Sequence, residues 1–464
     1  MQNLIEAALA NAKQMPFWLD NPAAPDPEPA LCGTIKADLA IVGGGFTGLW
    51  AAIQAKEADP SLNVVIVEAD RVAFGASGRP GGIISTSVMH GLKNENKFFP
   101  GDVEILERLG QENLDAFKDT VERHNIDADL EWTGEMTVAV KLEDIDELRE
   151  EFELHRRYGH DVRFLDRDET RAQLDSAQFL AGMWSRNRSG IVHPAKLAWG
   201  LKKAILALGV RIYEKTPLLD LEDRGDHLAI HTPEGEVVAR RVLLATNAFT
   251  AGDRRIKRRV MAMRDHVLAT APLTDEQLAR IGWANRQGIY DTGTELNYFR
   301  LTRDNRIVFG GSVSYHYAGS TAPPPEASTQ SFRNLVSFFY GKFPQLKDVA
   351  ITHLWGGPID YCTRFAMFFE PYHGGKAYYV GGYSGFGVAG SRFGARIGVA
   401  LLQGQDLPEL ELDMVRRRPN ILPPEPFRWI GAKITFHAMK GVDEKGGWRK
   451  LWLGLLDKLG YPMG

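Results

Sequence analysis

The stretch LAIVGGGFTGLWAA, residues 39–52, places the tightest constraint on how this chain can fold. A run of apolar residues leads into glycines at positions 43, 44, 45 and 48, and a second apolar run follows. Asp38, Gln54 and Lys56, together with the glycines, interrupt this window short of the roughly 20 apolar residues that a membrane-spanning helix needs. We therefore interpret the stretch as a buried strand, a glycine-rich turn and the beginning of a helix.

The glycines match a dinucleotide-binding pattern. Gly43, Gly45 and Gly48 have the spacing G-x-G-x-x-G directly after the predicted strand. In that pattern the first glycine permits a tight turn, the second lets the backbone approach a pyrophosphate, and the third lets the helix pack on the strand. A second strand, residues 63–70, carries Glu68, whose carboxylate would accept hydrogen bonds from ribose hydroxyls. An acid at this place disfavours the 2′-phosphate of NADP, which leaves NAD or FAD.

The remainder of the chain favours FAD over NAD. The segment GASGRPGG (75–82) follows the second strand at once, and GGYSGFG (381–387) begins the last predicted helix. FAD is long enough to be held from several parts of a chain, whereas NAD would leave the late glycine cluster unexplained. The alternative for residues 75–82 is a flexible surface loop. The residues that we expect to hold FAD are Gly43, Gly45, Phe46, Thr47, Gly48, Glu68, Ala69, Ala76, Ser77, Arg79, Gly81, Gly82, Leu218, Thr246, Asn247, Gly385, Phe386, Gly387 and Val388.

Composition excludes several other classes of protein. The net charge of −4 is too small to favour a nucleic-acid partner, and the twelve histidines lack the spacing of metal ligands. Two cysteines, Cys32 and Cys362, form neither a disulfide framework nor a C-x-x-C pair, which fits a reducing, cytoplasmic setting. The N-terminus does not have the pattern of a signal peptide. Four prolines predict that residues 21–34 are extended, with ordered structure beginning near Lys36.

Several of these segments together resemble one enzyme family. They are ADLAIVGGGFTGLWAA, VEADRVAFGASGRPGG, SGIVHPAKL, RRVLLATNAFT, NYFRLTRDNRIVFGG, LWGGPID and GGYSGFGVAGSRFGARIG. The chain resembles the D-amino acid oxidase and glycine oxidase family of FAD-dependent oxidoreductases, and within it the branch of gamma-glutamylputrescine oxidase-like enzymes. Two positions depart from that branch: Pro80 stands where asparagine is usual, and Phe386 where histidine is common. Polar contacts near the flavin would be lost at both.

The resemblance implies a fold and a division of the chain. The expected fold class is α/β, with a Rossmann-like FAD-binding domain interleaved with an α+β substrate domain that contains a mixed β-sheet. We predict an N-terminal leader at 1–35, FAD-binding segments at 36–95, 190–255 and 356–405, substrate-domain segments at 96–189 and 256–355, and a basic, aromatic extension at 406–464.

The resemblance also implies oxidation of a small-molecule amine, through its C–N bond, to an imine that water hydrolyses to an aldehyde or ketone. The acceptor would be O2, giving H2O2, or another electron acceptor. The alternatives are an amino-acid oxidase or dehydrogenase, and a peripheral membrane dehydrogenase that passes electrons to quinone. The basic, aromatic tail is typical of a membrane surface, but we favour a packed extension or a subunit contact. Oligomeric state stays open.

For the substrate site the sequence offers candidates but no catalytic base. Tyr298 and Arg300 face the same way on a predicted strand, and the alternative for them is an ordinary exposed or sheet-packing pair. Phe386 lies near the expected flavin. Asp360 stands where amino-acid oxidases of this family carry an arginine for the substrate carboxylate, so it would instead hold a remote cationic or hydrogen-bond-donating group of an amine. The alternative is that Asp360 caps a turn and Arg364 or Arg300 binds a carboxylate.

Two further residues receive structural interpretations. We expect His193 to be a helix-entry residue rather than a catalyst. We also expect the flavin to be non-covalent, because Cys362 falls several residues after the attachment position of relatives that tether flavin through a cysteine.

Overall fold

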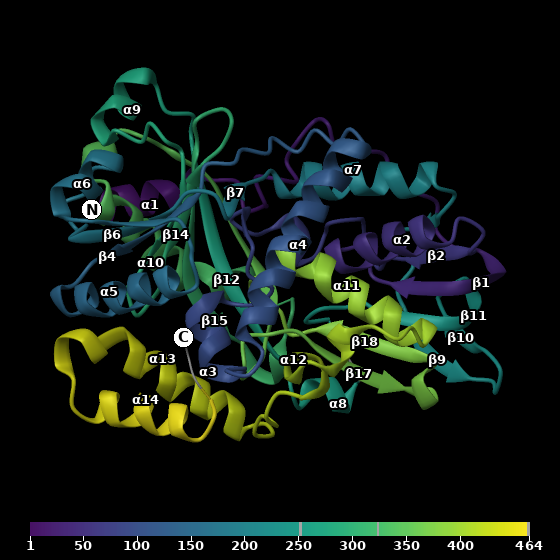
Figure 1. Ribbon diagram of the computed structural model, residues 1–464. Helices are drawn as coiled ribbons and strands as arrows, with labels where there is room; N and C mark the ends of the chain where they lie inside the picture. The colour runs from purple at the N-terminus through teal and green to yellow at the C-terminus, as the bar shows by residue number, and fades with distance from the viewer. Residues whose placement is uncertain (250–252, 323, 462–464) are drawn as a thin grey trace.

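The computed structural model describes residues 1–249, 253–322 and 324–461. Within these residues the chain forms two eight-stranded sheets and a short two-stranded sheet, β3 (Ile83–Ser85) with β7 (Ser189–Ile191). Figure 1 shows the two large sheets side by side, each with its own helices. Residues 250–252, 323 and 462–464, which fall in the predicted segments 190–255, 256–355 and 406–464, lie outside this description.

The first large sheet contains the predicted β-α-β unit. Strand β1 (Gly33–Val42), helix α2 (Phe46–Ala58) and strand β2 (Val64–Val67) follow one another as expected. The other strands are β8 (Arg211–Tyr213), β9 (Asp220–Asp223), β10 (Leu228–His231), β11 (Gly235–Leu244), β17 (Phe368–Tyr372) and β18 (Ala377–Gly381). The order is β17-β18-β11-β1-β2-β8, with β10 and β9 added beside β11. Because β1 pairs in parallel with β2 and β11, the carboxyl ends of these three strands meet at one edge.

Helices α2, α7 (Pro194–Ala207) and α11 (Gly387–Gln403) lie together on one face of this sheet (Figure 1). Glycine permits the close approach of α2 to β1, since a Cβ on Gly48 would lie 2.0 Å from the carbonyl oxygen of Gly43. Helix α7 begins at Pro194 as predicted, and His193 is its N-cap, accepting a 3.2 Å hydrogen bond from the Lys196 amide. The helix-entry role expected of His193 is therefore confirmed.

The second large sheet is mixed, as predicted. Its order is β16-β12-β15-β14-β13-β4-β6-β5, and β4 pairs with β13 in parallel while the other neighbours are antiparallel. The strands are β4 (Glu135–Ala139), β5 (Val162–Leu165), β6 (Ala181–Ser185), β12 (Met261–Thr270), β13 (Gly288–Asp291), β14 (Tyr298–Leu301), β15 (Ile307–Tyr315) and β16 (Ile351–Tyr361). Strand β16 continues through the predicted domain boundary at 355/356. The structure thus confirms the α/β fold class with a mixed second sheet.

Helices of the second region cover the second sheet and bridge to the first. Helix α10 (Thr329–Lys342) packs on β12 and β15, and α5 (Leu142–Arg157) packs on β4 and β6. Helix α4 (Val103–Arg123) contacts α11, and α3 (Gly91–Phe98) contacts both α4 and α5. The smaller helices are α6 (Arg167–Gln173), α8 (Arg254–Lys257), α9 (Asp275–Ile281) and α12 (Asp413–Arg416).

The N-terminal segment corrects one prediction, because ordered structure begins long before Lys36. Helix α1 (Gln2–Asn11) packs on α10 and β16. The side chain of Trp18 is fully buried, and its indole nitrogen donates a 2.8 Å hydrogen bond to the Pro80 carbonyl. Proline restricts only residues 21–34, which are not helical, as expected. Before them, Ile5, Ala8 and Ala12 bury their side chains in the core of the second sheet.

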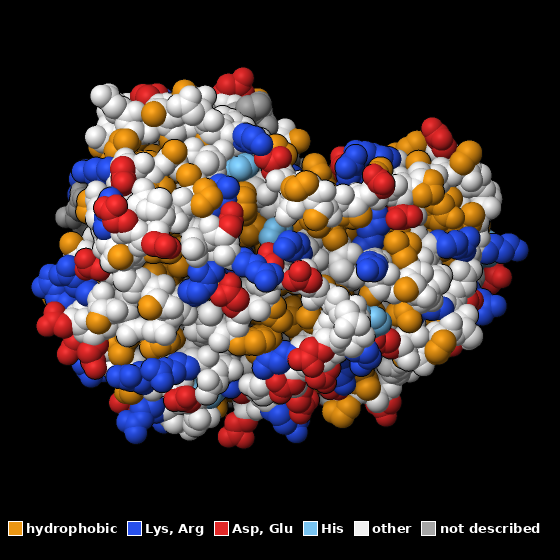
Figure 2. Space-filling model, turned by 90° about the horizontal axis from the view of Figure 1, so that it is seen from above, with side chains coloured by type: hydrophobic (Ala, Val, Ile, Leu, Met, Phe, Trp, Pro, Cys, Tyr) orange, Lys and Arg blue, Asp and Glu red, His pale blue; other side chains and the backbone are white. Residues whose placement is uncertain are grey.

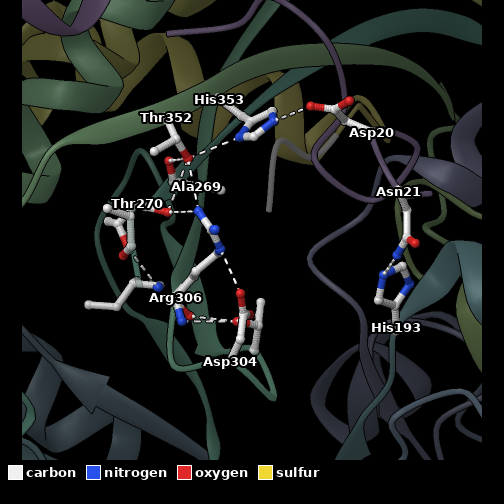
Figure 3. Close-up of polar contacts among 12 residues, drawn as sticks. Asp20, Asn21, His193, Ala269, Thr270, Asp304, Arg306, Thr352 and His353 are labelled. Carbon is white, nitrogen blue, oxygen red and sulfur yellow. Dashed lines mark hydrogen bonds and ion pairs between the residues drawn. The ribbon is translucent and has the colours of Figure 1, made fainter. Parts of the chain in front are cut away.

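Polar contacts fasten this segment to both regions of the fold (Figure 3). The Asp20 carboxylate lies 3.0 Å from Nε2 of His353 on β16, and Asn21 lies 3.4 Å from Nε2 of His193 at the start of α7. Figure 3 also shows Arg306 between the Thr270 carbonyl, at the end of β12, and the Asp304 carboxylate, in the turn between β14 and β15. The leader therefore connects the second sheet to a helix of the first.

The C-terminal extension forms a helical hairpin of α13 (Phe427–Lys445) and α14 (Trp448–Lys458) at the outer edge of the molecule (Figure 1). In the described part of the chain, none of the helices has an apolar stretch long enough to cross a membrane. On the face of the molecule seen in Figure 2, Lys and Arg side chains are interspersed with Asp and Glu side chains.

The burial of Trp18 generates the first prediction. Trp18→Ala should lower the free energy of unfolding by about 3–5 kcal/mol, because a large buried aromatic side chain is replaced by a cavity. Thermal and denaturant unfolding of the purified protein measure the change. Met15→Ala, at a side chain that is 37% exposed, is the matched control and should have little effect. Equal stability of the two variants would contradict the anchoring role of Trp18.

Candidate flavin and substrate site

A cavity of about 730 Å³ lies between the two sheets. Its wall comes from the glycine turn after β1, the end of β2, residues 75–82, the end of β11, the start of α11, and strands of the second sheet. Of the residues predicted to hold FAD, all but Gly48 line this cavity. Gly48 instead packs α2 against β1, which is the role that the glycine pattern assigns to its third position.

The glycine turn and the first turn of α2 shape one end of the cavity. Gly43 has φ +114°, and a Cβ there would lie 2.6 Å from the carbonyl oxygen of Ala245, so this position requires glycine. Gly45 is the N-cap of α2, and a Cβ on it would approach Ser77 Oγ to 3.0 Å. Because the positive end of a helix dipole favours anions, this end of the cavity suits a pyrophosphate.

Glu68 lies at the end of β2 and lines the same end of the cavity. Its Oε2 accepts a 2.6 Å hydrogen bond from the Gly44 amide, and its Oε1 accepts a 2.8 Å bond from the Asp70 amide. Burial raises the pKa of this carboxyl group, while the two amides oppose that rise. A carboxylate has further lone pairs, so Glu68 can fix the glycine turn and still accept hydrogen bonds from a ribose.

The loop at residues 75–82 is folded rather than flexible. Arg79 donates hydrogen bonds to the carbonyls of Phe74 at 2.8 Å and Gly356 at 2.9 Å, and Trp355 donates to the Arg79 carbonyl at 2.9 Å. Burial lowers the pKa of Arg79 to about 10, so this side chain is charged at neutral pH. These bonds tie the loop to β16, and its small residues leave room for a ligand along the cavity.

Two further observations fit a bound flavin nucleotide. The buried Oδ1 of Asn247, on the cavity wall, has no hydrogen-bond partner among the described residues. Gly385, with φ +101°, precedes α11, whose first residues also line the cavity. A polar, extended cofactor could donate a hydrogen bond to the unsatisfied acceptor and lie against the second helix N-terminus.

The carboxylate of Asp360 is hydrogen-bonded to the protein backbone. Its carboxylate accepts hydrogen bonds from the amides of Gly382 and Ser384, and burial raises its pKa to about 6. The side chain is 1% exposed. Asp360 borders the cavity, but its oxygens hold the GGYSG turn before α11, as in the turn-capping alternative. The geometry therefore does not support the hypothesis that Asp360 holds the remote group of an amine.

The two arginines considered as carboxylate ligands do not line the cavity. Arg300 donates to the carbonyls of Gly81 at 3.0 Å and Val192 at 2.6 Å, and Arg364 donates to those of Arg417 and Met414. Tyr298 and Arg300 do face the same way, toward residues 81–82, as the strand period predicted. Tyr298 lines the cavity, whereas the buried Arg300 guanidinium is hydrogen-bonded to backbone carbonyls.

Asp265 is a cavity residue that the sequence analysis missed. It lies on β12, and its Oδ2 accepts a 2.6 Å hydrogen bond from the Tyr298 hydroxyl. Burial raises the pKa of Asp265 to about 6, and the bond from Tyr298 opposes that rise. Met263 and Val267, two positions away on either side, also line the cavity. An acid between two apolar residues on one face of a strand was the signal that could have identified it.

The rest of this end of the cavity is aromatic, with one further acid. Phe386 lies between His90, with ring centroids 4.3 Å apart, and Tyr290, at 6.2 Å. Burial lowers the pKa of His90 to about 4, so this imidazole is neutral at neutral pH. Glu295, in the loop between β13 and β14, lines the cavity, and burial raises its pKa. Phe436 and Met439 of α13 close the wall.

Loss of the negative charge at Glu68 should weaken retention of FAD. The Gly44 and Asp70 amides donate to different oxygens of Glu68. In Glu68→Gln one of these oxygens becomes an amide NH2, which cannot accept, so one of the two hydrogen bonds is lost. We expect the Kd for FAD to rise about tenfold, the cost of one hydrogen bond to a charged group. Titration of the apoprotein with FAD measures it. The control is Asp38→Asn, in the middle of β1 and outside this cavity, and equal affinity of both variants would refute the role.

The flavin should be released by acid precipitation of the protein. Cys362 does not line the cavity. Its thiol donates to the carbonyls of Ala366 and Gly382, and burial raises its pKa, which disfavours the nucleophilic thiolate. We expect the yellow colour in the supernatant after acid precipitation, and Cys362→Ser to retain FAD. Flavin that stays with the precipitate would show a covalent link.

Comparison with known proteins bears on the same cavity. Residues 38–401 match the family model described as FAD dependent oxidoreductase. The chain is 30% identical to the probable oxidoreductase OrdL of Haemophilus influenzae, over 90% of this chain and 94% of that protein. It is 31% identical to the gamma-glutamylputrescine oxidoreductase of Escherichia coli, over 80% and 84%.

Among solved structures, glycine oxidase from Geobacillus kaustophilus superposes with a TM-score of 0.68 at 18% identity, covering 82% of this chain and 99% of that one. At this identity the likeness shows that the two proteins share a fold. The family match includes the glycine turn, all the cavity-lining residues except Phe436 and Met439, and most of α11. The chain therefore belongs to the family of FAD dependent oxidoreductases, and FAD is its cofactor.

Proposed function

We propose that this protein oxidises a C–N bond of a small amine to an imine, which water hydrolyses to an aldehyde or ketone. The observation that carries the proposal is the pair of acids, Asp265 and Glu295, on the substrate end of the cavity. Among the described residues that line the cavity, Arg79 is the single arginine. Its guanidinium already donates hydrogen bonds to two backbone carbonyls. Such a wall attracts a cation and offers little to a substrate carboxylate.

A relative supports an amine rather than an amino acid as substrate. The Escherichia coli relative is named gamma-glutamylputrescine oxidoreductase, and putrescine derivatives are amines. The family's structural neighbours include enzymes named for amino acids, such as glycine oxidase. For an amino acid the site would need a cationic partner for the carboxylate, and Arg300 and Arg364 are both engaged elsewhere.

The residues of the chain would prepare the amine for oxidation. Bound FAD supplies a two-electron acceptor for the hydride that leaves the carbon. The Asp265 carboxylate would attract the ammonium group and accept one of its protons, because an amine is oxidised in its neutral form. The Tyr298 hydroxyl, 2.6 Å from Asp265, orients that carboxylate. The aromatic wall of Tyr290 and Phe386 would exclude water until the imine forms.

We take O2 as the final acceptor, so that each turnover releases one H2O2. The cavity of about 730 Å³ reaches from the glycine turn after β1 to the acids of the second region, so one cavity would serve cofactor and substrate. Peroxide release measured for a panel of amines and amino acids tests the acceptor directly. Bleaching of the flavin by an amine under anaerobic conditions tests the first half-reaction without regard to the acceptor.

Removal of the Asp265 charge should impair amines selectively. We expect alkyl amines or diamine derivatives to be turned over better than glycine, sarcosine or D-alanine. Asp265→Asn should lower kcat/KM for the best amine by roughly a hundredfold, since an ion pair and a proton acceptor are both lost. Peroxide release and stopped-flow bleaching give the rates. Asp275→Asn, at an exposed residue of α9, is the control. Efficient turnover of glycine, unaffected by Asp265→Asn, would defeat the proposal.

The acid limb of the pH profile should report the ionisation of Asp265. Its pKa is about 6, so kcat/KM should fall as the pH decreases through 6 and the carboxylate becomes protonated. Tyr298→Phe removes the hydrogen bond that stabilises the carboxylate, so the pKa of Asp265 rises and the limb moves to higher pH. Profiles of wild type and Tyr298→Phe measure the shift, with exposed Tyr317→Phe as control. An unmoved limb would argue against Asp265 as the titrating group.

A further inference from the structure

The C-terminal hairpin exposes an unusual amount of apolar surface. Eight of the eighteen large hydrophobic side chains exposed in the described part of the chain lie between Ile421 and Leu459. Leu451 is 77% exposed and Phe427 is 66% exposed. Scattered exposed hydrophobic residues are normal on a protein surface, but a cluster of them marks an interaction site.

The exposed apolar residues have helical spacing. On α13 they are Phe427, Ile430 and Ile434, followed on the same face by His437; on α14 they are Trp448, Leu451 and Leu455, with Leu459 at the C-cap of the helix. The rings of His437 and Trp448 stack, with centroids 6.2 Å apart and an interplanar angle of 14°. This contact joins the two stripes into one surface. We call the eight residues named in this paragraph, which include His437 but not Ile421, the hairpin face.

The hairpin is anchored by its other sides, so the exposure of the hairpin face is a property of the folded protein. Ala432, Ala438 and Val442 of α13 are buried, and α13 packs on β15. Trp452 of α14 donates a 3.0 Å hydrogen bond to Thr435 of α13. Phe436 and Met439 of α13 reach the cavity wall. The helices therefore have a packed side, and the hairpin face is turned away from it.

Basic residues surround the hairpin face. Residues 427–461 contain seven Lys or Arg and three Asp or Glu, in a chain whose net charge is −4. Lys433 and Lys440 follow one edge of the stripe on α13, and Lys458 lies beside the stripe on α14; all three are exposed. Among the described side chains they form no ion pair, whereas Asp457 pairs with Lys97 at 2.6 Å. The hairpin thus carries an excess of positive charge. The face of the molecule seen in Figure 2, by contrast, carries charges of both signs.

We propose that the hairpin face docks the enzyme on an anionic phospholipid membrane. Leu, Ile, Phe and Trp on one side of a helix, with Lys at the edge, are the composition of helices that lie in the plane of the membrane interface. The apolar side chains would enter the lipid, and the lysines would meet the anionic headgroups, each contributing to attraction at low salt. This inference is independent of the substrate and acceptor proposed above.

A second copy of the chain is the competing occupant, and the charges disfavour it. A two-fold contact would place the same surface on both partners. Lysines at the rim of one hairpin face would then approach lysines of the other. The described acid that could relieve them, Asp457, is already held by Lys97. An anionic lipid surface instead satisfies both the apolar stripe and its basic rim.

Flotation of the FAD-loaded enzyme with vesicles tests the proposal. The vesicles are phosphatidylcholine alone, or phosphatidylcholine and phosphatidylglycerol in equal parts. We expect the enzyme to float with the mixed vesicles and to stay below with neutral ones. Binding should fall as salt is added, because about 1 M salt shortens the screening length to about 3 Å. Quenching of Trp448 by brominated lipid, absent in Trp448→Phe, would place the hairpin face in the bilayer.

Variants separate docking from a merely structural effect. Leu451→Glu with Leu455→Glu should reduce vesicle binding roughly a hundredfold, because two exposed leucines no longer enter lipid. Lys433→Glu with Lys458→Glu should weaken binding to the mixed vesicles. The matched control is Leu142→Glu, at a leucine of α5 that is 79% exposed and distant in sequence from the hairpin. All variants should bind FAD and unfold at the wild-type temperature.

Three outcomes would overturn the proposal. The first is that the wild type does not float with the mixed vesicles. The second is flotation that Leu451→Glu with Leu455→Glu leaves unchanged. The third is a dimer by light scattering that these two substitutions dissociate, with no vesicle binding by the wild type; that result would assign the hairpin face to a second copy of the chain.

Discussion

The buried guanidinium of Arg300 joins three parts of this structure, and the shape of the cavity depends on it. It extends from β14 of the second sheet to the carbonyl of Gly81, in the loop that follows β2, and to that of Val192, just before α7. The ring of Trp18 lies 4.8 Å from its carbon atom Cζ. Arginine suits this place because its fixed fork of donors can satisfy several carbonyls at once. Burial lowers its pKa only to about 9, so it keeps its charge at neutral pH.

That junction ties β14 of the second sheet to two segments of the FAD-binding region. Residues 81–82 lie between Tyr298 and Arg300, and glycine is needed at both, since a Cβ on Gly81 would lie 2.5 Å from the Tyr298 ring. The ring of Tyr298 in turn carries the hydroxyl that orients Asp265. One short loop therefore touches the expected flavin on one side and the substrate sheet on the other. The leader contributes through Trp18, which adds a third segment of the chain to the same junction.

Two aspartates that line the cavity have similar pKa values but different hydrogen-bond partners. Asp360 and Asp265 lie on neighbouring strands, and burial raises the pKa of each to about 6. Asp360 is held by backbone amides of the turn before α11, whereas Asp265 accepts from one backbone amide, that of His266, and from the Tyr298 hydroxyl, and it also lines the cavity. The first is suited to shape the site and the second to meet a substrate. Residue type alone does not distinguish them.

The sequence by itself determined the local elements and the cofactor. The glycine spacing, the strand–helix–strand order and Glu68 depend on contacts between residues close in the chain, so pattern reveals them. Only the tertiary structure decided which distant side chains share the cavity. Arg300 looked like a ligand-binding residue because a strand pattern gives the side to which it points, but not the carbonyls of residues 81 and 192 that satisfy it. The structure of the first 20 residues likewise depends on contacts with segments far along the chain, which no local pattern records. Helix α1 packs on α10 and β16, and Trp18 is buried and bonded to the Pro80 carbonyl.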